Sequence, residues 1–127
     1  MLKRALLPLT LLVAIAVATP PDAVDAEFHF ALSKSMPEAD SSVESPQEVR
    51  LWFTEVPEAE TTSIRVIGAD ERAIQTGDVT QDDENKQSFG IALEHALSPG
   101  TYTVAWRAMG SDGHVVRSDY EFTVVAQ

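Results

Sequence analysis

The residues of this chain best suited to chemistry are an aspartate and a histidine near its C-terminal end. Asp112 and His114 are separated by one glycine within residues 109–124 (MGSDGHVVRSDYEFTV). The Ser-Asp-Gly sequence before the histidine is typical of a turn, where side chains are not needed for packing. A carboxylate and an imidazole are ligands for divalent metal ions, but a pair of ligands does not make a site. A further ligand has to come from elsewhere in the chain.

Two other histidines could supply that ligand. His95 lies at the end of an expected strand between apolar neighbours, and we interpret it as an ordinary surface histidine. His29, taken alone, fits a solvent-facing residue at the head of an edge strand. If the first strand of the fold lies beside the last, however, His29 comes near the turn that holds Asp112 and His114, whose side chains project to one side of extended backbone. We therefore expect these three residues to converge at one edge of the fold.

The start of the chain predicts export. A positively charged beginning is followed by an apolar run over residues 5–18 that is too short to span a bilayer comfortably. Small residues permit cleavage after Ala18 or Ala26, and cleavage after Ala26 is preferred because the residues between them do not resemble a strand. We expect a signal peptide over residues 1–26 and one domain over residues 27–127.

Composition narrows the classes of function. The formal net charge is −11, and cleavage after Ala26 removes equal numbers of acidic and basic residues. Such a surface repels nucleic acid and anionic lipid and attracts cations. The chain has no cysteine, which excludes disulfides, a thiolate nucleophile, a soft thiolate ligand and a lipoprotein anchor. No second apolar run follows, so we expect a soluble mature protein.

The remainder of the chain reads as a series of strands. Apolar residues recur at every second position in several segments separated by turn sequences, which predicts an all-β fold, an antiparallel β-sandwich. These segments are residues 48–54, 62–67, 88–93, 101–108 and 119–125. We also expect a short strand over residues 71–76 and an exposed acidic hairpin loop over residues 77–87.

One turn has a more specific signature. In residues 97–102 (LSPGTY) a Pro-Gly turn leads to Tyr102 at the start of a strand. This resembles the tyrosine corner of immunoglobulin-like sandwiches, in which the phenol hydroxyl bonds to upstream backbone. The corner is a folding device and says nothing about function.

Taken together, residues along almost the whole exported chain match a known pattern. They are His29-x-x-Leu32-x-x-Ser35-x-Pro37, then Glu48-Val49-Arg50-Leu51-x-Phe53-x-Glu55, then Pro99-Gly100-Thr101-Tyr102-x-Val104-x-Trp106-Arg107-Ala108, and Ser111-Asp112-Gly113-His114 followed by Phe122-x-Val124. This pattern resembles the CopC family of periplasmic copper-resistance proteins. The resemblance implies an immunoglobulin-like, cupredoxin-like β-sandwich, a Greek-key barrel of about seven strands, that carries Cu(II) without catalytic turnover.

The resemblance also implies a ligand set. In the family, Cu(II) is held by the first histidine of the mature chain, through its ring and free amine, and by an Asp-x-His motif; the matching residues are His29, Asp112 and His114. Glu55 matches a glutamate that orients a ligand imidazole. Nitrogen and oxygen ligands suit Cu(II), although the same side chains could also bind iron or zinc. An inner-membrane copper transporter of the CopD type is the implied transfer partner.

Some residues depart from the family pattern. Cleavage after Ala26 leaves two residues ahead of His29, which suggests an alternative in which the amine, two backbone amides and the His29 ring bind Cu(II) in one plane. Met36 and Met109 are far apart and are expected to be packing residues, so we predict no Cu(I) site. Ser118 replaces a family glycine, while Trp106 and Arg107 are assigned to packing and ion pairing.

The residues are also compatible with two other functions. A metal-free interaction module would have the same fold with incidental histidines. A small copper-dependent oxidative enzyme would also hold copper through an N-terminal histidine, as polysaccharide monooxygenases do. The small domain, the carboxylate ligand and the lack of a flat aromatic face, with Trp106 expected in the core, argue against an enzyme. We expect a binding protein.

Overall fold

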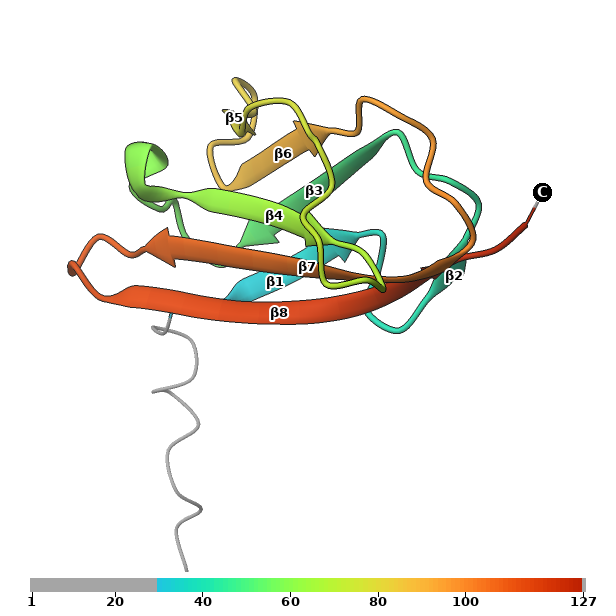
Figure 1. Cartoon of the computed structure of the whole chain (residues 1–127). Helices are drawn as coiled ribbons and strands as arrows, with labels where there is room; N and C mark the ends of the chain where they lie inside the picture. The colour runs from blue at the N-terminus through green and yellow to red at the C-terminus, as the bar shows by residue number, and fades with distance from the viewer. Residues whose placement is uncertain (1–29, 127) are drawn as a thin grey trace, which may run out of the picture.

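Two four-stranded β-sheets pack face to face in the computed structural model, which describes residues 30–126 (Figure 1). The first sheet has the order β1-β3-β6-β5 and the second β2-β8-β7-β4. The elements are β1 (Leu32–Met36), β2 (Ser42–Val43), β3 (Glu48–Phe53), the short 3-10 helix η2 (Ala59–Thr61), β4 (Ser63–Ile67), β5 (Thr80–Gln81), β6 (Ser88–Ala92), β7 (Gly100–Met109) and β8 (Val115–Val124). The expected all-β sandwich is confirmed. Within residues 30–126, no helix has the length and apolar character needed to cross a membrane.

The pairing of the first and last strands differs from the expectation. β1 pairs with β3 and therefore belongs to the sheet opposite β8. The strand that lies beside the end of β8 is β2, which pairs with it in parallel, so the sandwich is not wholly antiparallel. β2 has two residues, too few to produce an alternating pattern in the sequence.

The hairpin of β7 and β8 is the longest feature of the fold. Each strand has ten residues, and their register runs without interruption from Gly100 opposite Val124 to Met109 opposite Val115. The alternation in the sequence placed the start of the last strand at residue 119, which is too late. The first residues of β8 extend past the core, where Val115 is 40% exposed, so inward and outward positions do not differ in polarity there.

The segment before β6 was also predicted incorrectly. Residues 71–76 contain only isolated bridges at Ala73 and Thr76, whereas the short strand β5 lies inside the expected loop and pairs with β6. Most of these side chains are exposed, so their alternation does not report burial.

The core lies between the two sheets. It consists of the inward side chains of β3, β4, β6, β7 and β8, which are the alternating apolar residues of the sequence: Val49, Leu51, Phe53, Ile64, Val66, Phe89, Ile91, Tyr102, Val104, Trp106, Ala108, Phe122 and Val124, together with Leu97. Phe53 is central, with ring centroids 5.2 Å from Trp106 and 6.0 Å from Phe89. Trp106 is therefore a core residue, as predicted.

The tyrosine corner is present. Tyr102 Oη donates a hydrogen bond of 2.6 Å to the carbonyl oxygen of Ser98. The ring is buried and stacks on Phe122 with centroids 5.7 Å apart. This contact fixes the chain where it enters β7.

Candidate metal site

The turn between β7 and β8 holds the predicted aspartate and histidine. The backbone N–H of Gly110 donates to the carbonyl of His114, and the N–H of Gly113 donates to the carbonyl of Gly110, both at 3.0 Å. Gly113 has φ of 83°, a left-handed conformation that glycine adopts without a Cβ penalty. The turn, rather than extended backbone as expected, brings the side chains of Asp112 and His114 together.

Asp112 contacts His114 through both carboxylate oxygens. Oδ1 accepts the backbone N–H of His114 at 3.0 Å, and Oδ2 lies 2.7 Å from His114 Nδ1. This side-chain hydrogen bond raises the pKa of His114 and lowers the pKa of Asp112. The side chain of Asp112 is 64% exposed, and that of His114 is 85% exposed. When Nδ1 carries the shared proton, Nε2 is the ring nitrogen left with a lone pair for a metal ion.

Three parts of the chain meet at Gly110. This residue is buried, and a methyl group in place of one of its hydrogens would lie 3.1 Å from Glu55 Oε1, 3.2 Å from Asp112 Oδ1 and 3.4 Å from Phe30 Cβ. Glu55 comes just after β3 in the first sheet, whereas Asp112 belongs to the hairpin of the second sheet. Two carboxylates and the segment that leads into β1 therefore surround one point.

The segment just before β1, which lies beside Gly110, is held by several contacts with β3 and the residue after it. The ring of Phe30 stacks on Phe53 with centroids 5.1 Å apart. The N–H of Ala31 donates to Thr54 Oγ1 at 3.0 Å, and the N–H of Thr54 donates to the carbonyl of Ala31 at 2.9 Å. These contacts place residue 30 beside Glu55 and the turn.

His29, the third predicted ligand, lies outside the described residues. Within residues 30–126, no three histidine, aspartate or glutamate side chains gather closely enough to hold a metal ion. The structure thus brings Asp112, His114 and Glu55 to one end of the sandwich and leaves the position of the His29 ring untested.

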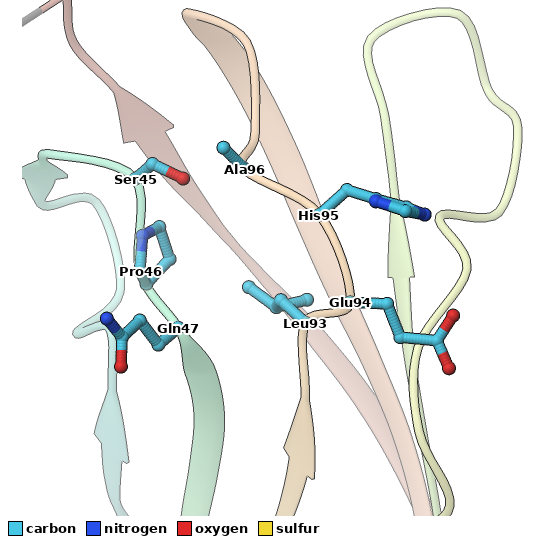
Figure 2. Close-up of a pocket in the computed structure, with 7 residues that line it drawn as sticks. All are labelled: Ser45, Pro46, Gln47, Leu93, Glu94, His95 and Ala96. Atoms are coloured by element: carbon cyan, nitrogen blue, oxygen red, sulfur yellow. The ribbon is translucent and has the colours of Figure 1, made fainter.

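His95 lies elsewhere. It is exposed and borders an open pocket of about 300 Å³ lined by Ser45, Pro46, Gln47, Leu93, Glu94, His95 and Ala96 (Figure 2). Its ring points away from Ser45 and Gln47 (Figure 2). The pocket adjoins the start of β3, whereas Glu55 follows its end, so His95 and the candidate site occupy opposite ends of that strand.

Three other expectations can be compared with the structure. Met36 is 47% exposed, so it is not a packing residue, whereas Met109 is partly buried. Arg107 forms no ion pair within residues 30–126, contrary to the expectation. Sequence reasoning missed Gly110 and Phe30, although a glycine directly before a turn can signal close approach of other groups.

The comparisons with known proteins agree with this fold. A family model described as the CopC domain matches residues 32–125. The chain belongs to the CopC domain family. Copper resistance protein C of Escherichia coli is 32% identical to it over 108 residues, which are 80% of this chain and 86% of that protein.

Solved structures of the CopC family match the same region. CopC from Methylosinus trichosporium OB3b has a TM-score of 0.69 at 30% identity, covering 76% of this chain and 93% of that one. PcoC from Escherichia coli, described as a methionine-rich copper resistance protein, has a TM-score of 0.68 at 30% identity, covering 76% and 99%. The resemblance inferred from the sequence is confirmed.

Proposed function

We propose that the protein is a periplasmic copper(II)-binding protein that carries or buffers copper in copper homeostasis and resistance. Membership of the CopC family supports a role in copper resistance. The observation that carries the proposal for this chain is the convergence at Gly110, where the segment directly after His29 meets Glu55 and Asp112. This arrangement supports the proposal because it brings two carboxylates close to residue 30, at the turn that also holds His114.

The proposed ligands are His29, Asp112 and His114. His114 offers Nε2, and a carboxylate oxygen of Asp112 has lone pairs enough to bind the ion while it still accepts from His114. Glu55, beside the N-terminal segment, would accept a hydrogen bond from the His29 ring and set its orientation. Cu(II) binds nitrogen and oxygen ligands more tightly than the other divalent first-row metals do.

The proposal is restricted to Cu(II). Soft thiolate and thioether groups select Cu(I), and the chain has no cysteine and three methionines including Met1. Met36 ends β1 and Met109 ends β7 next to the turn, and they do not form a cluster with a third sulfur in residues 30–126. A tight Cu(I) site in a competition titration would contradict this restriction.

Export and transfer complete the proposal. Residues 1–26 act as a signal peptide, and the domain over residues 27–127 passes copper to an inner-membrane transporter of the CopD type. The mass of the mature protein recovered from a periplasmic fraction tests the cleavage. A chain beginning at Glu27 is expected, whereas one beginning at His29 would allow its free amine to bind the ion directly.

Native mass spectrometry with added Cu(II) tests the central proposal. We expect one ion per mature chain, and an affinity that falls by several orders of magnitude in His114→Ala. His95→Ala is the matched control, because it removes the other exposed histidine of the described chain and should leave binding unchanged. Absence of binding by the unmodified mature protein would favour a metal-free interaction module.

The same measurement separates the two proposed ligand sets. If the amine, two amides and the His29 ring bind Cu(II) in one plane, replacing both Asp112 and His114 by alanine lowers the affinity by no more than half. A loss of several orders of magnitude in that double variant supports convergence of both ends of the domain.

We propose no catalytic turnover. Lys34 Nζ lies 4.7 Å from the centroid of the Trp52 ring, and Trp106 is buried, so neither indole offers a flat open face for a polysaccharide. Ascorbate-driven peroxide production by the copper-loaded protein would contradict this part of the proposal.

A further inference from the structure

Three arginines lie on the outer face of the second sheet. The side chains of β7 alternate, and Tyr102, Val104, Trp106 and Ala108 are buried, so Arg107 between them faces outward. Arg107 is directly opposite Arg117 of β8, and Arg65 of β4 is one row further along the same face. We call Arg65, Arg107 and Arg117 the arginine patch.

The patch is unfavourable for the isolated domain. Like charges directly opposite each other in an antiparallel pair are destabilising, as for Arg107 and Arg117. Arg107 Nε is buried without a hydrogen-bond acceptor in the described part of the chain, which leaves a donor unsatisfied. None of the three arginines forms an ion pair within residues 30–126, although the chain has 20 acidic residues.

Acidic neighbours on this face do not neutralise the Arg107–Arg117 pair. Asp119 is opposite Ala105, one row away from the pair, and Glu121 is one row further from the turn. Toward the turn the next outward row is Met109 and Val115, which carry no charge. The two guanidinium groups therefore lie between a row that holds both Arg65 and Asp119 and an uncharged row, and neither forms an ion pair within residues 30–126.

We propose that the arginine patch is the docking surface for an acidic segment of a protein partner. Guanidinium groups bind carboxylates in a bidentate manner, and a carboxylate bound between Arg107 and Arg117 would offset the repulsion between the two arginines. The net charge of −11 repels an acidic partner from the rest of the surface, so the patch determines where and in which orientation it docks.

The position of the patch relates it to the candidate metal site. The Arg107–Arg117 row is two residues along the hairpin from the Met109–Val115 row that precedes the turn, or about 7 Å at the usual rise of a strand. A partner docked there would lie one outward row away from the turn that holds Asp112 and His114. Docking at the arginine patch does not require a bound metal ion, because none of its three residues is a proposed ligand.

A peptide titration tests the docking surface. The probe is a blocked hexaglutamate peptide added at low ionic strength to the ¹⁵N-labelled, metal-free mature protein, with hexaglutamine as the uncharged control. We expect the Nε–H signal of Arg107 and the amide signals of β7 and β8 to shift. The double variant Arg107→Gln, Arg117→Gln should bind about tenfold more weakly.

Controls distinguish binding at the arginine patch from an effect of net charge and from a failure of the variant to fold. Arg72→Gln with Lys86→Gln removes the same charge from loops outside the patch and should bind as the unmodified protein does. An equal loss in that control, shifts confined to other elements, or equal binding of hexaglutamine would overturn the proposal. Binding of inorganic phosphate at the patch without binding of hexaglutamate would also overturn it, since that indicates a small-anion site. If the arginine double variant does not fold, the map of shifted signals in the unmodified protein decides.

Discussion

Gly110 sets how closely the groups of the candidate site approach one another. Its missing side chain leaves room for Glu55, Asp112 and Phe30, which come from three separate stretches of sequence. This space matters for a metal site, because ligand positions have to be correct within about 0.5 Å.

Gly110→Ala should therefore lower the affinity for Cu(II) by about tenfold, because the new methyl group displaces both carboxylates and Phe30 by a few tenths of an ångström. A Cu(II) competition titration measures the effect. Gly77→Ala is the control, since its methyl group would meet only Ala92 at 3.7 Å or more. Equal affinities for the two variants would show that Gly110 does not position the site.

The Asp112–His114 contact should be visible in the metal-free protein by NMR titration. The hydrogen bond to Asp112 raises the pKa of His114 above 6.5, and Asp112→Asn should return it toward that value. The contact therefore adds stability below about pH 6.5, and this is lost as the pH rises through the folded-state pKa. Solvent screening keeps the contribution small, because both side chains are largely exposed. An unchanged pKa in Asp112→Asn would contradict the contact.

Among the elements, the strands with one buried face were predictable and the others were not. β3, β4, β6 and β7 carry an apolar residue at every inward position, so period two identified them. β2 and β5 have two residues each, and the outer half of β8 extends beyond the core, so none of them shows the pattern.

The parts of the candidate site that have their own sequence signature were predictable. The turn with Asp112 and His114 has its own sequence signature, and the family pattern indicated Glu55. The roles of Phe30 and Gly110 depend on how the two sheets face each other, which no local pattern specifies. For this reason the expectation that β1 lies beside β8 was wrong, although residue 30 still comes close to Asp112.

The two tyrosines form a matched pair for testing the tyrosine corner. Tyr102→Phe should destabilise the fold by about 1 kcal/mol, because it removes the hydrogen bond to Ser98. Tyr120→Phe should be neutral or stabilising, since Tyr120 Oη is buried without a hydrogen-bond partner in residues 30–126. Urea unfolding of the two variants measures the difference. A larger loss for Tyr120→Phe would reverse the assignment.

For the molecule as a whole, Tyr120 links stability to alkaline pH. Burial raises the pKa of Tyr120 to about 12. The nearby Ser35 side chain opposes this rise, although the Ser35 hydroxyl does not make a well-formed hydrogen bond with Tyr120 Oη. The unfolded chain loses this proton near pH 10.0, before the folded protein does, so stability should fall as the pH rises from there to about 12.

Tyr120→Phe should weaken this alkaline loss, and unfolding monitored by circular dichroism at increasing pH measures it. Tyrosinate absorbance of the folded protein provides the second reading. An alkaline transition at the same pH in Tyr120→Phe and in the unmodified protein would assign the loss to other groups.

The meeting at Gly110 also joins the two layers of the sandwich. Glu55 and the segment before β1 belong to one sheet, whereas Asp112 and His114 belong to the hairpin of the other. An ion shared between them would act as a cross-link that exists only when both layers are assembled. Binding of the ion and folding of the domain would then be thermodynamically coupled, so the melting temperature would rise with the free concentration of the ion. Release of the ion would be fastest where a partner separates the two sheets.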